Sequence, residues 1–129
     1  MTNQEIYDAA LSMACEVEVP NANEDYRERA TYLIAALCYR YAPLDVRYRE
    51  AQGLEKQNLL PINCLPLSAT FPLCDDFGTA VSTALAGMLT LSENPDMSAR
   101  LSALADEMFA ELRARIPYQK ERIAQMYNL

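Results

Sequence analysis

The stretch that decides the fold runs from Asp75 to Pro95 and reads DDFGTAVSTALAGMLTLSENP. Its large apolar residues recur every three or four positions, which is the repeat of one face of a helix: Phe77, Val81, Leu85, Met88 and Leu89. Small residues occupy positions between them and would permit close packing against another helix: Ala80, Ala84, Ala86 and Gly87. We therefore expect a helix that Asp75 or Asp76 caps at its start and that ends at Ser92-Glu93-Asn94.

A second helix is predicted directly after this one. Asn94 is suited to cap it, and Pro95 falls at the first helical position, where a missing N–H costs nothing. This helix should end at Ile116-Pro117, and its apolar residues again follow helical spacing: Met97, Leu101, Leu104, Ala105, Met108 and Leu112. Because the connection between the two helices is short, we expect them to pack as an antiparallel hairpin.

Two further helical stretches are predicted before this hairpin. Thr2 and Glu5 form a capping-box pattern, which indicates a helix from about Asn3 to Glu16. A longer helix follows the break at Pro20, and its apolar stripe predicts the face that is buried: Tyr26, Ala30, Leu33, Ile34, Leu37 and Tyr41.

Pro43 is expected to interrupt this longer helix, because proline lacks a backbone N–H and clashes with the preceding turn. A short separate helix with a changed direction is predicted over Leu44–Ala51, and Gly53 should end it. The chain therefore reads as mainly α: one domain over residues 1–129, built as a small bundle of four to five helices. Composition agrees, since 51% of the 129 residues are hydrophobic and only 3 are glycine.

The segment 54–72, in the middle of the chain, breaks the helical pattern. Its three prolines do not fit a helix interior, and they push the residues before them towards extended geometry. We expect extended chain packed on the helices, or a short β-hairpin. Its apolar side chains serve either a binding loop or a cover for the core, and the sequence favours neither. As an extended interaction loop, its candidate interface residues are Leu59, Leu60, Ile62, Leu65 and Phe71.

The C-terminal tail, residues 118–129, keeps large apolar residues where a free terminus would normally be polar. Either the tail folds back on the core of its own chain, or it docks on a neighbouring subunit or partner. If it docks outward, its candidate interface residues are Tyr118, Ile123 and Tyr127.

The charge of the chain narrows the classes of function. A net charge of −7 repels nucleic-acid phosphates at long range, which disfavours a protein that coats DNA or RNA. Basic residues concentrate in the ranges 27–56 and 113–122, where they form either solvated helix faces or a patch that faces an acidic partner. We see no run of about 18 apolar residues and no signal peptide, so we expect a soluble, intracellular protein without a membrane partner.

Residues suited to catalysis and metal binding are scarce. The chain has no histidine, which excludes histidine-based triads, general bases and metal sites. Its four cysteines stand at wide, irregular spacings, so a zinc site would need all four thiolates to converge; we expect reduced, mostly buried thiols instead. We predict no cofactor, no metal and no enzymatic activity. The one thiol that a helix start could activate is Cys74.

Tyrosine is concentrated in the predicted long helix and the short one after it. The five residues lie on more than one face, so they do not all fit one buried stripe: Tyr26, Tyr32, Tyr39, Tyr41 and Tyr48. Since tyrosine combines apolar area with a polar tip, it is common at protein interfaces, and this crowding favours a surface for a partner.

The second half of the chain resembles a known family. Phe71-Pro72-Leu73-Cys74-Asp75-Asp76-Phe77 leads into the helix of small and apolar residues. Ser92-Glu93-Asn94-Pro95 breaks that helix, and a long helix and a tail follow, closing on Ile123 and Tyr127. This pattern over Phe71–Tyr127 resembles the head–tail adaptor (connector) proteins of tailed bacteriophages and related prophages, and the rest of the chain resembles them by layout only.

The resemblance implies a structural role without catalysis. Family members form homo-oligomeric rings below the portal at the virion neck, and DNA passes through the channel without specific binding. The implied partners are further copies of the chain, the portal protein, and a tail or stopper protein. The implied location is the host cytoplasm during assembly and then the virion neck. The alternative that the residues leave open is a small cytosolic helical protein-binding module or regulator.

Overall fold

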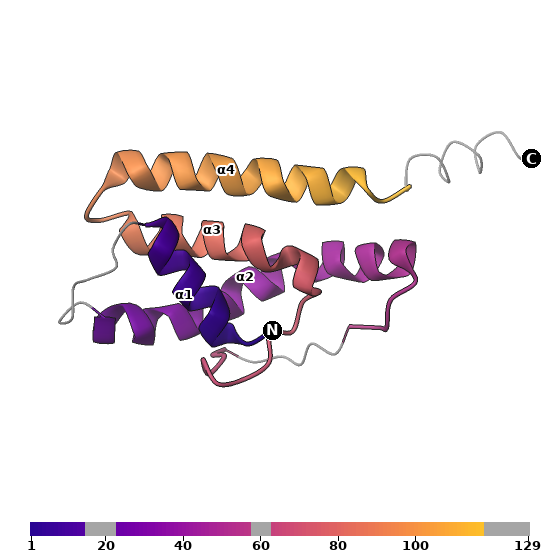
Figure 1. Ribbon diagram of the computed structural model, residues 1–129, viewed down its shortest axis with the longest axis horizontal. Coiled ribbons are helices and arrows are strands. Elements are labelled where there is room, and N and C mark those ends of the chain that lie inside the picture. Colours follow the sequence, from indigo (N-terminus) through magenta and orange to yellow (C-terminus); the bar gives the residue numbers. More distant parts are fainter. Residues whose placement is uncertain (15–22, 58–62, 118–129) are drawn as a thin grey trace, which may run out of the picture.

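Helices make up most of the structure, a computed structural model that describes residues 1–14, 23–57 and 63–117. In chain order they are α1 (Asn3–Met13), α2 (Asn23–Gln52), α3 (Gly78–Thr90) and α4 (Pro95–Ala114), with the 3₁₀ turn η1 (Asp75–Phe77) before α3 (Figure 1). The mainly α prediction is confirmed. The predicted cap at Asp75 or Asp76 is wrong, because both residues lie inside η1 and no side chain caps η1 or α3.

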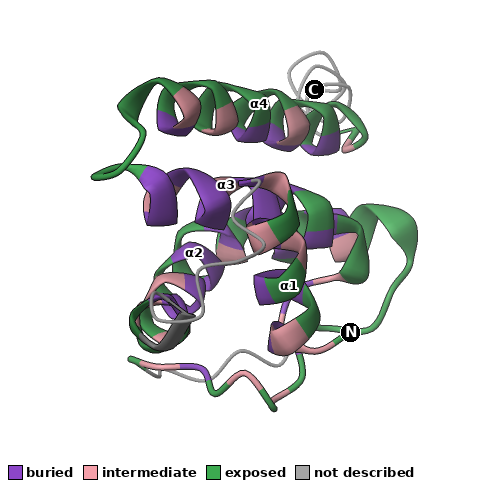
Figure 2. Cartoon of the chain, turned by 60° about the vertical axis from the view of Figure 1, so that its left-hand side comes forward, coloured by how far each residue is buried: buried purple, intermediate pink, exposed green. Residues whose placement is uncertain are grey.

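Helix α3 lies in the centre of the fold. Figures 1 and 2 show it between α4 on one side and α1 and α2 on the other. Ten of its thirteen residues are buried, as expected for a helix that other helices surround. The hydroxyls of Ser82, Thr83 and Thr90 are buried as well, and each donates to the backbone carbonyl four residues earlier, at 2.8 Å. Their polarity is therefore satisfied inside the helix.

The hairpin of α3 and α4 is confirmed, and so is the role of the small residues. A Cβ atom at Gly87 would lie 2.9 Å from Ser102 Oγ on α4, so glycine is what allows this close approach. Ser98 Oγ donates to the Gly87 carbonyl at 2.6 Å across the same contact. The Asn94 side chain caps α4 by accepting from Met97 N, as predicted. On α4, Leu104 was predicted to be buried, but it is 43% exposed.

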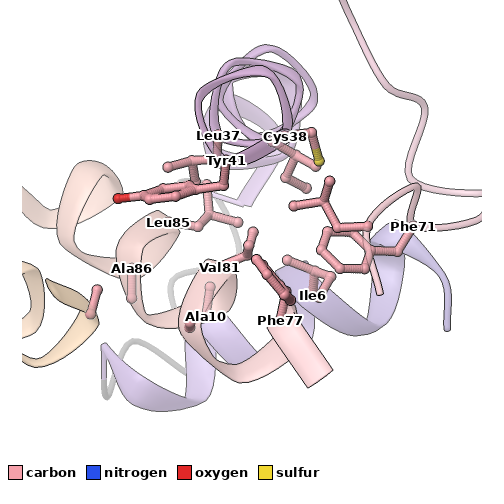
Figure 3. Packing of buried hydrophobic residues seen from close by; sticks show 14 of the residues in the cluster. Ile6, Ala10, Leu37, Cys38, Tyr41, Phe71, Phe77, Val81, Leu85 and Ala86 are labelled. Carbon is pink, nitrogen blue, oxygen red and sulfur yellow. The ribbon is translucent and has the colours of Figure 1, made fainter. Parts of the chain in front are cut away.

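The core is formed by all four helices together with residues of the segment before α3. Figure 3 shows Leu37 and Tyr41 of α2 facing Val81 and Leu85 of α3, with Ile6 of α1 beside them. Aromatic rings extend this core towards α4. Tyr41 and Phe109 stack with ring centroids 3.6 Å apart, and Phe109 meets Phe77 edge to face. Such pairs add about 0.5–1.5 kcal/mol each beyond the area that they bury.

The predicted break at Pro43 is wrong, because α2 continues through it to Gln52. Proline inside a helix costs about 3 kcal/mol. Leu44, the next residue, and Tyr48, just over one turn further on, are buried, and burial of large apolar side chains contributes about 1.5–3 kcal/mol each. Packing of the inner face therefore outweighs the proline. The predicted end at Gly53 is confirmed: its φ is +69°, and Leu54 N donates to Arg49 O at 2.8 Å.

The short β-hairpin predicted for the middle segment is not seen, since the described residues contain no strand. The segment instead makes isolated backbone hydrogen bonds to the helices. Gln4 N donates to Leu67 O at 2.8 Å, and Leu65 N donates to Thr31 O at 3.0 Å. One isolated bridge joins Thr2 and Thr70. Prolines in this segment lack the N–H groups that a ladder of strand hydrogen bonds requires, which favours such single contacts.

Candidate protein-interaction surface

The outer face of α2 carries a row of exposed apolar residues. We call it the α2 stripe, and its members are separated by four, three, four and three positions: Tyr32, Ala36, Tyr39, Pro43 and Val46. The exposed fractions of Tyr32, Tyr39 and Val46 are 55%, 41% and 40%. At 1.5 Å per residue the stripe is about 21 Å long. Its spacing is that of the seam along which two helices pack against each other.

The α2 stripe points away from the core of its own chain. Ile34, Leu37 and Tyr41 are buried, and in a helix of 3.6 residues per turn they lie opposite Tyr32 and Tyr39. Figure 2 shows this division as a buried inner side and an exposed outer side of α2. Two large aromatic side chains are therefore held at the surface in a row, which is typical of a protein-interaction site.

A basic groove lies beside the α2 stripe, between α2 and α4. We call it the arginine groove, after Arg40, Arg47 and Arg113, which line it together with one carboxylate, Asp106. Its cavity measures about 350 Å³, and the stacked rings of Tyr41 and Phe109 also line it. Among the described residues that line the groove, three guanidinium groups outnumber one carboxylate, in a chain of net charge −7. Such a groove attracts carboxylates at short range.

A buried polar network fixes the opposite edge of α2. The Asp45 side chain is fully buried and accepts from three donors: Arg49 Nε at 2.8 Å, Gln57 Nε2 at 2.7 Å and Cys74 N at 2.9 Å. Arg49 also donates to the backbone carbonyls of Glu55 and Pro72. These bonds attach Glu55, Gln57, Pro72 and Cys74 to α2, so the network anchors the two ends of the middle segment.

Tyr48 adds a second link between α2 and the start of α3. Its hydroxyl donates to Asp76 Oδ2 at 2.5 Å, and its ring meets Phe77 edge to face. The hydrogen bond to Asp76, followed by burial, raises the pKa of Tyr48 above its ordinary value. Tyr48 therefore remains protonated at neutral pH and serves as a structural donor.

The predicted interface residues fall into two groups. Leu65 and Phe71 are buried in the core of their own chain, so their side chains have a packing role there. The rest lie outside the described residues: Leu59, Leu60, Ile62, Tyr118, Ile123 and Tyr127. An interface role for the middle segment and for the tail stays a prediction.

The described cysteines resemble structural thiols. Burial, and secondarily the negative charge of Asp45, raises the pKa of Cys38 to about 12. Burial also raises the pKa of Cys74, the thiol that a helix start was expected to activate. Over residues 1–14, 23–57 and 63–117, no three or more Cys, Asp or Glu residues are grouped so that they could hold a metal ion. In the same part of the chain, no helix has both the length and the apolarity to cross a bilayer.

The crowded tyrosines of α2 were evident in the sequence, but the other members of the α2 stripe were not recognised. Ala36, Pro43 and Val46 belong to it only when α2 is one continuous helix, and the expected break at Pro43 hid the repeat. The signal that could have found it is the alternation of four and three positions from Tyr32 to Val46. The arginine groove could not be read from the sequence, because Arg113 comes from another helix.

Comparison of the chain with known protein families, with curated proteins and with solved structures finds no match.

Proposed function

We propose that this chain is a non-enzymatic structural protein of a phage or prophage neck, which joins the portal to the tail as a head–tail adaptor. The observation that carries the proposal is the α2 stripe. The described helices already share one apolar core, and α2 still exposes Tyr32, Tyr39 and Val46 in a row. A row of exposed apolar side chains is a feature of interaction surfaces, which a subunit of an assembly requires.

The resemblance of Phe71–Tyr127 to phage adaptors gives this surface its proposed context. The partners are further copies of the chain in a ring, the portal protein above, and a tail or stopper protein below. A net charge of −7 suits a ring around DNA, because an acidic wall repels phosphates and lets the duplex slide. The protein would act in the host cytoplasm during assembly and then in the virion neck.

Catalysis has little support in the described residues. Cys38 and Cys74 have raised pKa values, so both remain thiols at neutral pH and are poor nucleophiles. The polar networks at Asp45 and Tyr48 each have a sufficient structural role, since their groups are paired with one another. We therefore assign the activity of this protein to its surface.

The test is binding to the portal protein encoded in the same genome. Purified portal rings and the chain are mixed and separated by sedimentation, with a Tyr32→Glu/Tyr39→Glu variant and a Leu91→Glu control. Leu91 is 62% exposed and lies at the end of α3, outside the α2 stripe. We expect the wild type and the control to co-sediment with the portal. The tyrosine variant should stay in the supernatant, because its subunits no longer assemble through the α2 stripe. A wild type that does not bind the portal contradicts the proposal and favours the small protein-binding module.

A further inference from the structure

We infer that the α2 stripe of one chain packs on the outer face of α4 of a second copy, head to tail. The inference rests on the proposed function, because it names the contact through which a ring of subunits closes. It commits to one occupant for the α2 stripe, another copy of this chain. The two faces match in shape and in charge, and they lie on different helices.

The outer face of α4 is exposed and carries a row of mostly small side chains. Opposite its buried residues Ala105, Phe109 and Leu112, the helix presents a row of alanines interrupted by one glutamate. Each member of this row is exposed: Ala99, Ala103, Glu107, Ala110 and Ala114. The spacing of four, four, three and four positions follows one face of a helix, as the α2 stripe does.

The two faces are complementary in size. Tyr32 and Tyr39 project from α2 as large side chains one heptad apart. Between alanines such as Ala103 and Ala110, the surface of α4 leaves hollows that large side chains fill when two helices pack. Packing α2 on another α2 would instead place tyrosine against tyrosine and leave the alanine face of α4 uncovered.

The two faces are also complementary in charge. Arg40 and Arg47 follow Tyr39 and Val46 by one position each, so they line one edge of the α2 stripe. On α4, Glu107 and Glu111 lie on the exposed side, one turn apart. Opposite charges across the contact favour this pairing. The chain thus supplies both the arginines and the carboxylates that meet them.

The positions of the two faces make the contact head to tail. The α2 stripe and the outer face of α4 are different surfaces of the chain, one on each helix, although the two helices also meet where Tyr41 stacks on Phe109. One chain can therefore use its α2 stripe on one neighbour and its α4 face on another at the same time. A contact of this heterologous kind repeats until it closes a ring, or continues as a filament.

The first experiment blocks one face at a time. Tyr32→Glu introduces a charge into the α2 stripe, and Ala103→Arg introduces bulk into the α4 face. We expect the wild type to form species larger than a dimer in sedimentation velocity and each variant alone to remain monomeric. An equimolar mixture of the two variants should give a dimer of one chain each and nothing larger, because one intact face of each kind remains. Thermal melting by circular dichroism checks that both variants fold.

The second experiment exchanges the charges. Arg40→Glu/Arg47→Glu should weaken association about ten-fold or more, and Glu107→Arg/Glu111→Arg should do the same. The chain with all four substitutions should associate again, because the pairs are restored with the signs reversed. The inference is overturned by a wild type that stays monomeric at every soluble concentration, by a variant mixture that stays monomeric, or by a fourfold variant that does not recover.

These outcomes are separate from the test of function. A chain that binds the portal but shows no charge-swap recovery retains the adaptor role and loses this contact. A chain that shows the recovery but ignores the portal retains the contact and loses the adaptor role.

Discussion

Helices α3 and α2 both carry large apolar side chains, and they differ in what covers them. On α3, Val81, Leu85 and Leu89 are buried, and other helices surround them. On α2, Leu37 and Tyr41 are buried in the same core, while Tyr32 and Tyr39 are held at the surface. The comparison teaches that apolar content alone does not separate core from surface. The position of a residue around the helix separates the two, because each turn of α2 carries both inner and outer residues.

The largest loss of stability is expected at Leu85 of α3, which is fully buried in the core. Leu85→Asp would bury an unpaired charge at a fully buried position, which should cost more than about 4 kcal/mol and unfold the domain. Far-UV circular dichroism and urea unfolding measure it. The matched control is Leu104→Asp on the exposed side of α4, which should change the unfolding free energy by about 0.5 kcal/mol or less. A Leu85→Asp variant that melts near the wild type would contradict the central place of α3.

The second-largest loss of stability is expected at Asp45, on the edge of α2 that anchors the two ends of the middle segment. Asp45→Ala removes the acceptor of three donors and leaves the Arg49 charge without its partner, at a cost of about 3 kcal/mol. Urea unfolding gives the loss, and hydrogen exchange should show faster exchange of the Cys74 amide. The control, Asp25→Ala, removes an exposed carboxylate from Arg29 at 3.9 Å and should leave stability unchanged. Equal losses in the two variants would rule out an anchoring role for Asp45.

Features that depend on neighbouring residues could be predicted from the sequence, whereas features that depend on tertiary packing could not. Thr2, Asn94 and Gly53 were predicted as helix ends and act as such, because caps and αL ends depend mainly on neighbouring residues. The cap predicted at Asp75 or Asp76 failed, because both residues lie inside η1. Pro43 was misjudged, because burial of the opposite face of α2 outweighs its local cost. Leu104 was misjudged because it lies outside the buried face of α4, which Ala105, Phe109 and Leu112 form.

The interaction surface was predicted less well than the fold. Leu65 and Phe71 were chosen because they are apolar and lie in a loop, and the core contains them. Apolar character is the same signal for a core residue and for an interface residue, so composition could not separate the two. The α2 stripe needed the continuous register of α2, and the arginine groove needed two helices to come together.

A smaller, pH-dependent effect comes from the inner face of α2. Cys38 has a pKa raised from 9.0 to about 12, so above pH 9 the unfolded chain releases a proton that the folded chain keeps. The Cys38 contribution to stability is therefore complete below pH 9 and falls by up to about 1.4 kcal/mol per pH unit as pH rises towards 12.

Cys38→Ala removes this contribution, so its stability should fall less steeply with pH than that of the wild type. Urea midpoints measured at several pH values between pH 8 and about pH 11 test it. A residual slope is expected in the variant, because the pKa values of Tyr7, Tyr48 and Cys74 are also raised. Parallel slopes for wild type and variant would show that the Cys38 thiol ionises equally in the folded chain.

The most direct test of the account measures folding and association on the same variant of the α2 stripe. Tyr32→Gln/Val46→Gln keeps α2 helical and removes apolar area from its outer face. We predict that the unfolding free energy of the monomer changes by about 1 kcal/mol or less, while self-association in sedimentation velocity is lost. A loss of stability close to that of Asp45→Ala, with association intact, would place the stripe in the core and contradict the account.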